Sequence, residues 1–360
     1  MMDMRMLKRT LKIAAVILLA LFLLLALALE LPFLWAGDSA DATGYADWMS
    51  RTLTGPERLA DIAMLGAHDA LTADMELSSR VDEASVASPF QLGICKSLGY
   101  RQSKTQLAGV SGLLEGGVRY LDIRVTRDPD TGTFYTVHNY YSAPLAQYLD
   151  EITDFLARHP GEILVLDFQH CYDVSAPDGR LGETHFEELY ALLLKSGLLD
   201  YACTPALDTA VYAEVTENGS RAACVILMKY TGGRTEFLDY ETSIESDWFN
   251  TDSPETIFTG LDAAAARQDG MDAGRFRVQQ GVLTMQANLP GIFNALGSWS
   301  LLRRAEAFNA DYAQRQNEAW LRAMPIVMTD HTLSGKGGAH ALLMEKIIAY
   351  NKTLASAAQE

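Results

Sequence analysis

Short apolar runs that resemble buried strands alternate along this 360-residue chain with amphipathic stretches that resemble helices. This alternation is typical of parallel strands covered by helices, because a crossover between parallel strands leaves room for a helix. About seven strands can be counted, close to the eight of a closed barrel. A doubly wound open sheet would give the same pattern, but no G-x-G-x-x-G or phosphate-loop glycine motif opens any of the helices. The sequence therefore predicts an α/β barrel. Its strands are expected over residues 59–67, 117–138, 162–170, 222–230, 282–288 and 325–331, and its main helices over residues 102–115, 145–159, 186–199, 301–324 and 339–355.

The stretch 117–138 carries an unusual set of polar side chains. Asp122 and Arg124 are two residues apart in an extended segment, so one face of a strand presents both a carboxylate and a guanidinium. A turn signal at 128–132 and a second short strand then bring His138 back toward the same end. An acid, a fixed cation and an imidazole on strand ends favour phosphoryl or acyl transfer. The alternative is a buried salt bridge with a surface histidine.

Two further pairs of an aspartate and a histidine lie at the ends of apolar runs. His68 and Asp69 follow the run 59–67, and Asp330 and His331 end the run 325–331. The carboxyl ends of parallel barrel strands form the rim that carries active sites, so we expect His68 and Asp69 at that rim. The alternatives are a core histidine that caps a strand end and a surface aspartate–histidine pair.

The N-terminal residues combine basic and apolar side chains. Four basic residues precede an apolar run of 17 residues, Ile13 to Leu29, which as a helix would be about 26 Å long. Extended to Trp35 it could just cross a bilayer core of about 30 Å, with the N-terminus in the cytoplasm. We therefore predict a single-pass membrane anchor over residues 1–37, a linker over 38–56 and an extracytoplasmic catalytic barrel over 57–360. The alternative is a signal peptide cleaved after Ala26-Leu27-Ala28.

Composition excludes some partners and cofactors. The formal net charge of −17, with no basic cluster after residue 12, argues against nucleic acid. No C-x-x-C pair or His-Glu-x-x-His motif supports a zinc site. In an exported protein, the four cysteines could form up to two disulfides. These are Cys95, Cys171, Cys203 and Cys224.

Five segments together resemble the catalytic domain of phosphatidylinositol-specific phospholipase C, most closely its metal-independent bacterial members. The resemblance implies a distorted or incompletely closed TIM-type barrel, a membrane phospholipid as substrate, and no metal or other cofactor. The segments are LGAHDAL at 65–71, GVRYLDIRV at 117–125, TVHNY at 136–140, ARHPGEILVLDF at 157–168 and VMTDH at 327–331.

The same resemblance assigns roles to five residues. His68 matches the general base that takes the proton of the inositol 2-hydroxyl, and Asp330 matches the carboxylate paired with that base. His138 matches the general acid that protonates the leaving diacylglycerol oxygen, and Asp69 matches its supporting carboxylate. Arg124 matches the arginine that stands where eukaryotic relatives hold calcium. The expected products are diacylglycerol and a cyclic polyol phosphate.

The headgroup positions depart from the bacterial pattern. Asp122 matches a carboxylate beside Arg124, and Gln169 and Lys229 stand where the relatives hold the inositol ring with a lysine and an arginine. The ring-stacking tyrosine and its neighbouring aspartate are replaced by Leu289 and Ala287, unless Asp167 or a residue of 239–281 supplies the missing carboxylate. Three alternatives remain. They are a headgroup-binding barrel with weak catalysis, a phosphodiesterase for another polyol phospholipid, and a calcium-dependent glycerophosphodiester phosphodiesterase, whose usual His-Arg-Gly opening is absent here.

Overall fold

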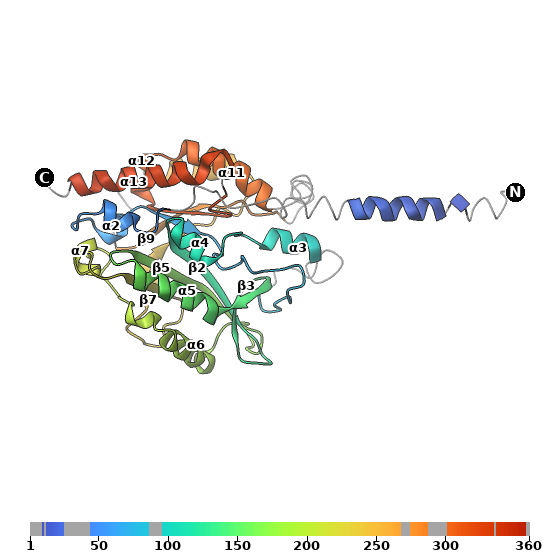
Figure 1. Cartoon of the computed structure of the whole chain (residues 1–360), viewed down its shortest axis with the longest axis horizontal. Coiled ribbons are helices and arrows are strands. Elements are labelled where there is room, and N and C mark those ends of the chain that lie inside the picture. The colour runs from blue at the N-terminus through green and yellow to red at the C-terminus, as the bar shows by residue number, and fades with distance from the viewer. Residues whose placement is uncertain are drawn as a thin grey trace. The chain divides into compact units, whose positions relative to one another are not determined.

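The computed structural model of the chain has two compact units, Met1–Gly37 and Asp38–Glu360. It describes residues 9–10, 12–24, 44–85, 96–267, 274–286, 301–334 and 336–357. Figure 1 draws these residues from blue at the N-terminus to red at the C-terminus. The second unit holds every predicted site residue.

In the first unit, the described residues 9–10 and 12–24 are helical. Within the described residues, no helix is both long enough and apolar enough to cross a membrane. This finding contradicts the predicted transmembrane anchor and the single-pass, extracytoplasmic localisation that was inferred from it. The possible cleavage site at residues 26–28 and Trp35 lie outside the described residues.

The second unit is built on a sheet of eight parallel strands, with a short antiparallel ribbon attached to it. The parallel strands follow the order β7-β6-β5-β2-β1-β10-β9-β8, and all neighbours along this path pair in parallel. The predicted α/β barrel is therefore confirmed. The parallel strands are β1 Met64–Ala67, β2 Val118–Arg127, β5 Ile163–Asp173, β6 Ala223–Met228, β7 Leu238–Asp239, β8 Ile244–Glu245, β9 Phe276–Gly281 and β10 Ile326–Thr329, and the ribbon comprises β3 Phe134–His138 and β4 Tyr140–Pro144.

The barrel is open along one seam. Strands β7 and β8 are at the two ends of the strand order, and among the described strands they do not pair with each other. Each has only two residues, and the short helix α8, Tyr240–Ser243, connects them. The incomplete closure that the sequence led us to expect is thus located between β7 and β8.

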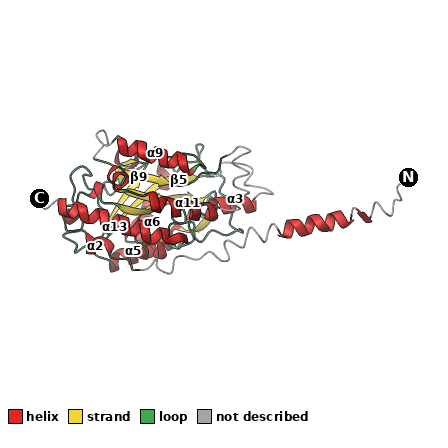
Figure 2. Cartoon of the chain, turned by 90° about the horizontal axis from the view of Figure 1, so that it is seen from above, coloured by secondary structure: helices red, strands yellow, loops and turns green. Residues whose placement is uncertain are grey.

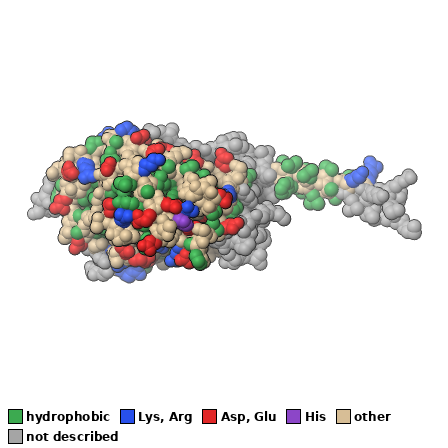
Figure 3. All heavy atoms as spheres, turned by 90° about the horizontal axis from the view of Figure 1, so that it is seen from below, with side chains coloured by type: hydrophobic (Ala, Val, Ile, Leu, Met, Phe, Trp, Pro, Cys, Tyr) green, Lys and Arg blue, Asp and Glu red, His purple; other side chains and the backbone are tan. Residues whose placement is uncertain are grey.

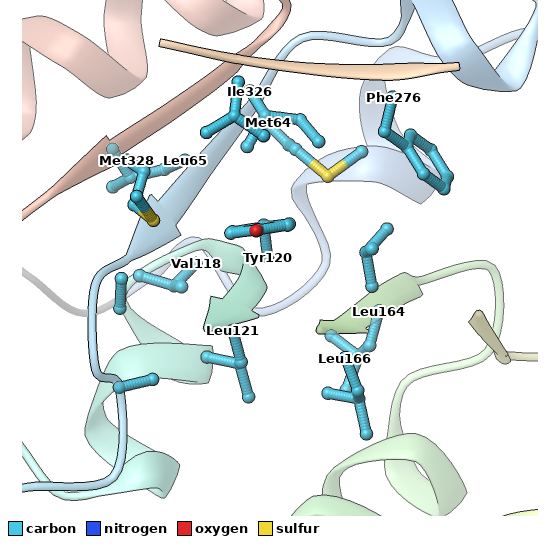
Figure 4. Close-up of a cluster of buried hydrophobic side chains, with 14 of the residues drawn as sticks. Met64, Leu65, Val118, Tyr120, Leu121, Leu164, Leu166, Phe276, Ile326 and Met328 are labelled. Atoms are coloured by element: carbon cyan, nitrogen blue, oxygen red, sulfur yellow. The ribbon is translucent and has the colours of Figure 1, made fainter. Parts of the chain in front are cut away.

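Helices pack around the sheet, as Figure 2 shows, and strands β1, β6 and β10 are buried on both faces. Covered strands must be apolar on both faces, which is why β6 is buried at all six positions. Figure 4 shows a cluster of buried hydrophobic side chains on β1, β2, β5, β9 and β10, among them Met64, Leu65, Val118, Tyr120, Leu121, Leu164, Leu166, Phe276, Ile326 and Met328. The surrounding helices are α2 Trp48–Thr52, α3 Lys96–Ser103, α4 Val110–Glu115, α5 Leu145–Arg158, α6 Glu183–Lys195, α7 Tyr212–Val215, α9 Pro254–Ala266, α11 Leu301–Arg315, α12 Glu318–Ala323 and α13 Ala339–Ala357.

Several predicted boundaries were wrong, for local reasons. The predicted helix 301–324 is divided into α11 and α12, because the Asn317 side chain accepts a hydrogen bond from the Trp320 N–H and starts a new helix. The predicted helix 102–115 is likewise two helices, α3 and α4, with residues 104–109 between them. Strand β9 ends at Gly281, so it precedes the extended segment predicted at 282–288.

The stretch predicted as a linker belongs to the barrel unit over its described part, residues 44–56. Trp48 and Met49 of α2 are buried in the hydrophobic core. The Trp48 indole N–H donates a hydrogen bond of 3.0 Å to the carbonyl of Gly117, directly before β2. These residues therefore close the amino-terminal end of the barrel.

The described cysteines are free thiols. Cys171, Cys203 and Cys224 form no disulfide, and Cys95 lies outside the described residues. Cys203 is close to Cys224, but the parallel bridge pairs Cys224 with Ala202. Adjacent residues of an extended chain point to opposite faces, so the Cys203 and Cys224 thiols point apart.

The surface reflects the acidic composition. Figure 3 shows acidic and basic side chains interspersed with apolar ones over the face of the barrel unit that it presents. The described surface on that face therefore resembles an ordinary solvated exterior.

A buried ion pair joins three elements at the amino-terminal end of the barrel. Arg119 of β2 and Glu162 before β5 lie 2.8 Å apart, and neither side chain is exposed. Glu162 also accepts hydrogen bonds from the N–H groups of Met49 and Ser50 in α2. Arg119 donates to the carbonyls of Leu114, Val118, Tyr45 and Ala46.

Removing the Glu162 charge should therefore destabilise the fold strongly. We expect Glu162→Gln to lower the free energy of unfolding by about 3–5 kcal/mol, because it leaves the Arg119 guanidinium buried without a counter-charge. The matched control is Glu115→Gln, whose partner Arg158 is largely exposed, and this change should cost less than about 1 kcal/mol. Urea unfolding followed by circular dichroism measures both, and equal losses would contradict the structural role of the pair.

Candidate active site

The carboxyl ends of four strands bring together the five residues predicted to be catalytic. His68 and Asp69 directly follow β1, and Asp330 directly follows β10, which pairs with β1. Arg124 lies in the carboxyl-terminal half of β2, and His138 is the last residue of β3. The structure therefore places all five at one rim of the barrel.

His68 is surrounded by carboxylates. Its Nδ1 lies 2.7 Å from Asp330 Oδ1, and its Nε2 lies 3.4 Å from Asp69 Oδ2 and 3.8 Å from Asp122 Oδ2. Burial lowers the pKa of this imidazole, but the charges of Asp69 and Asp330 outweigh burial and raise the pKa to about 9. At neutral pH, His68 in the free protein is therefore mainly the imidazolium.

Asp69 connects the two histidines and the arginine. Its backbone has a φ of 39°, a conformation that costs energy for a residue with a side chain. Its N–H donates to Asp122 Oδ2 at 3.2 Å, which helps to hold this turn. Burial raises the pKa of the Asp69 carboxyl, but Arg124 and the two histidines more than offset this effect and hold the pKa below its usual value.

His138 has a different environment from His68. Its Nδ1 lies 2.7 Å from the carbonyl oxygen of Ser103 and 3.1 Å from Asp69 Oδ2, so this nitrogen carries a proton that it donates. Burial lowers the pKa of His138, and Asp69 offsets this only in part. The two imidazole rings have their centroids 6.2 Å apart. Two histidines with opposite pKa shifts thus face each other across the site.

Arg124 supplies the fixed positive charge. Its Nε contacts Asp69 Oδ1, its Nη2 lies 3.8 Å from Asp122 Oδ2, and the same Nη2 lies 3.5 Å from Gln169 Oε1. Burial disfavours the cation, but the carboxylates outweigh burial and raise the pKa of the guanidinium further. A side chain that is 20% exposed can still reach a bound ligand.

Asp122 and Asp167 lie deeper than Arg124 and are almost inaccessible. They are register partners on β2 and β5, and the Tyr120 hydroxyl donates a hydrogen bond of 2.5 Å to Asp167 Oδ2. Burial raises the pKa of both carboxyls, and the mutual charge of the pair raises that of Asp167 further. Both were predicted to bind substrate, but the structure places them behind Arg124.

The two other predicted substrate-binding residues line a cavity beside the site. Gln169 and Lys229 contribute to a cavity of about 330 Å³ at the carboxyl ends of β5 and β6. Gln169 Nε2 donates to the hydroxyl of Tyr240, and the Lys229 ammonium lies 4.8 Å from the centre of the Tyr240 ring. This volume is at the lower end of the range found for small-molecule sites.

Sequence reasoning did not find two tyrosines near this site. Tyr120 shares a strand face with Asp122 and Arg124, so its period-two spacing could have indicated it. Tyr240 gave no signal, because it lies in the stretch 239–281 that showed no clear pattern. Leu289 and Ala287, at the family's aromatic and acidic positions, lie outside the described residues.

One group of side chains has the composition of a metal site. His68, Asp69 and Asp122 offer ligand atoms within 4.8 Å of one another. The guanidinium of Arg124 lies against both carboxylates, so a cation would compete with a fixed positive charge for these oxygens. We therefore treat these three residues, together with Arg124, as one group, which we call the Arg124 cluster.

The chain is similar in sequence to known phospholipase C-like proteins. No family model matches the chain. It is 30% identical over 261 residues to PI-PLC X domain-containing protein 3 of Danio rerio, covering 68% of this chain and 76% of that protein. It is 33% identical over 164 residues to the variant-surface-glycoprotein phospholipase C of Trypanosoma cruzi, covering 40% and 42%.

Two solved structures have a similar fold. A mutant of the phosphatidylinositol-specific phospholipase C of Staphylococcus aureus superposes with a TM-score of 0.58 at 16% identity, covering 86% of this chain and 98% of that one. The enzyme from Listeria monocytogenes gives 0.55 at 19% identity, covering 86% and 99%. At these identities the likeness concerns the fold alone.

The carboxylates around His68 make its pKa a measurable property of the site. We expect Asp330→Asn to lower the pKa of His68 from about 9, because one of the charges that raise it is removed while burial remains. Titration of the histidine ring signals by NMR measures the change. His185→Asn, outside this cluster, serves as the control, and an unchanged His68 pKa in Asp330→Asn would contradict the pairing.

Proposed function

Because the chain belongs to the family of PI-PLC X domain-containing proteins, phospholipase C-like enzymes, we propose that it cleaves the glycerol–phosphate bond of phosphatidylinositol-like lipids. The observation that carries this proposal is that the His68 and His138 rings lie 6.2 Å apart beside Arg124, each with a carboxylate partner. A transfer at phosphorus requires a group that takes a proton, a group that gives one, and a cation for the charge on the phosphate oxygens.

The proposed reaction assigns one step to each histidine. His68 removes the proton from a headgroup hydroxyl next to the phosphate, and that oxygen attacks phosphorus. The bond from phosphorus to the glycerol oxygen breaks, and His138 donates a proton to this leaving oxygen. The products are diacylglycerol and a cyclic polyol phosphate. Asp330 orients His68 and stabilises its charged form, and Asp69 does the same for His138.

The pKa shifts bear on the protonation state that reacts. The base must be neutral and the acid must be charged, whereas in the free protein the pKa of His68 is about 9 and that of His138 is below its ordinary value. The reactive fraction of the protein is the product of two fractions, that of neutral His68 and that of charged His138. This product is greatest at a pH between the two pKa values, whichever histidine has the higher pKa. The reactive state is then a minor one, and the bound phosphodiester stabilises it by placing a negative charge beside His138 and Arg124.

The headgroup is proposed to lie over Gln169, Lys229 and Tyr240. An amide, an ammonium and a phenol can bind the hydroxyl groups of a polyol, and Gln169 also contacts Arg124. Tyr240 would supply the aromatic ring that the sequence lacks at Leu289. A polyol with a hydroxyl next to the phosphate is therefore the proposed headgroup, and choline and ethanolamine do not meet this requirement.

The two-histidine mechanism predicts loss of turnover in either histidine variant. We expect His68→Ala and His138→Ala each to reduce the rate of headgroup release by about 10²–10⁴-fold. Phosphorus NMR of the protein with phosphatidylinositol micelles should show a five-membered cyclic phosphate only for the unmutated protein and the control. The control is His159→Ala, which lies after α5 at the other end of the barrel. Full activity in either active-site variant would rule out this mechanism.

The Arg124 cluster predicts catalysis without a metal ion. We expect EDTA and added calcium to leave the rate unchanged, and Arg124→Lys to lower kcat by about 10²–10³-fold, because an ammonium cannot reproduce the guanidinium contacts. Initial rates on micelles measure both effects. A rate that requires calcium, or a fully active Arg124→Lys variant, would overturn the proposed role of Arg124.

A further inference from the structure

A short segment between α3 and α4 lies against the rim that carries the predicted catalytic residues. It comprises residues 103–106, of which Ser103, Thr105 and Gln106 are buried. Through these three residues the segment forms hydrogen bonds with the carboxyl ends of β1, β3 and β10. These strand ends are far apart in the sequence, so one segment joins parts of the site that belong to different stretches of the chain.

The Gln106 side chain links the ends of β1 and β10. Its Nε2 donates to the carbonyl oxygens of His68, at 3.0 Å, and Thr329, at 3.1 Å, and its Oε1 accepts from the Thr332 N–H at 3.0 Å. Two carbonyls and one N–H fit only one orientation of this buried amide. Since Thr329 directly precedes Asp330, Gln106 holds the backbone of the predicted base next to that of its carboxylate partner.

Thr105 supports two residues whose backbone is strained. Asp69 and His331 have φ values of 39° and 46°, in the left-handed region that residues with side chains disfavour. The Thr105 hydroxyl donates to the carbonyl of Asp69 at 3.0 Å, and the Thr105 carbonyl accepts from the His331 N–H at 2.6 Å. The hydroxyl oxygen of Thr72 fixes the segment in turn, because it accepts from the N–H groups of Thr105 and Gln106. Strained residues persist where the surrounding structure holds them, and here one segment holds the turns after β1 and β10.

Ser103 contacts the other histidine of the site. Its carbonyl accepts from His138 Nδ1 at 2.7 Å, which fixes a proton on this nitrogen. The Ser103 hydroxyl donates to the carbonyl of Gly99 at 2.8 Å and accepts from the Asn139 side chain at 3.0 Å, so the serine is itself held on both sides. The Nε2 of His138 is therefore the nitrogen left to exchange a proton with a ligand.

We propose that Thr105 and Gln106 are positioning residues for the reaction, which hold the ends of β1 and β10 in the arrangement that pairs His68 with its carboxylate. The proposal rests on the proposed function, because it concerns the same reaction. Both residues act through backbone groups of the residues that carry out the chemistry. An imidazole displaced by about 1 Å no longer meets the attacking hydroxyl, and a displacement of this size can cost about 10²-fold in rate. Loss of these contacts should therefore lower kcat and leave the binding of substrate nearly unchanged.

Two substitutions of similar volume separate this role from an effect on stability. Gln106→Met removes the amide, and Asn351→Leu is the matched control, because the buried Asn351 amide bridges the N–H and the carbonyl of Ala63 at the other end of β1. We expect Gln106→Met to lower kcat about tenfold or more, with the apparent KM changed less than about twofold. Asn351→Leu should keep kcat within about twofold of the unmutated protein even where urea unfolding shows an equal loss of stability. Phosphorus NMR of the full chain with phosphatidylinositol micelles measures both rates.

The pKa of His68 gives a second measurement, which needs no substrate. Burial lowers this pKa, and the charges of Asp69 and Asp330 outweigh burial and raise it to about 9. A looser contact with Asp330 weakens one of these charges, so Gln106→Met should lower the pKa of His68, by less than Asp330→Asn does. Asn351→Leu should leave it unchanged. Titration of the histidine ring signals of the full chain by NMR measures these values.

Thr105 provides a further pair of variants, which does not depend on whether Gln106→Met folds. Thr105→Val removes the hydroxyl at nearly constant volume and should lower kcat at least about threefold. Thr105→Ser keeps the hydroxyl and should restore most of the rate.

Three results would overturn the proposal. They are an unchanged pKa of His68 in folded Gln106→Met, an equal loss of kcat in Gln106→Met and Asn351→Leu, and equal rates for Thr105→Val and Thr105→Ser. Absence of cleavage by the unmutated protein would refute the proposed function instead. The two failures are distinguishable, because the pKa of His68 is measured without substrate.

Discussion

The contact between the Arg124 guanidinium and the carboxylates around it is the interaction on which the rest of the site depends. Asp69 and Asp122 are buried at the rim of the barrel, where an uncompensated carboxylate costs several kcal/mol. Arg124 provides compensation for both. With its charge stabilised in this way, Asp69 can lie next to both His68 and His138 and influence the pKa of each. The pKa of His68 is raised because Asp330 adds its charge to that of Asp69, whereas burial lowers the pKa of His138 and Asp69 offsets this only in part.

Much of the fold was predictable, because parallel strands covered by helices must be apolar on both faces. The runs that became β1, β5, β6 and β10 are all of this kind. The strands at the seam were not predictable, since β7 and β8 have two residues each and cannot show a period. The packing of Trp48 was also missed, because a polar, glycine-rich stretch gives no sign that its one large side chain is buried. The N-terminal prediction was wrong, since no helix among the described residues is both long enough and apolar enough to cross a membrane.

The candidate site was predictable for a different reason. His68 and Asp330 are 262 residues apart in the sequence, and the only connection between them is that β1 and β10 are neighbours in the barrel. The resemblance to a family predicted that these two strand ends are neighbours, and periodicity alone could not have predicted it. Residue pattern could not separate the half-buried Gln169 from the fully buried Asp167 either. The two lie two positions apart on β5, and only the depth of Asp167 behind Arg124 distinguishes them.

The seam between β7 and β8 has a consequence for how this barrel can diverge. In a closed barrel every strand is fixed by two neighbours, so a change of length anywhere disturbs the register of the whole ring. An open seam removes that constraint at one place. Residues can be inserted or lost around α8 while the hydrogen bonds of β1, β2 and β10 remain as they are. Tyr240 of α8 contacts both Gln169 and Lys229, so the same place supports two side chains that line the cavity beside the site. Ligand preference can therefore evolve at the seam independently of the catalytic histidines.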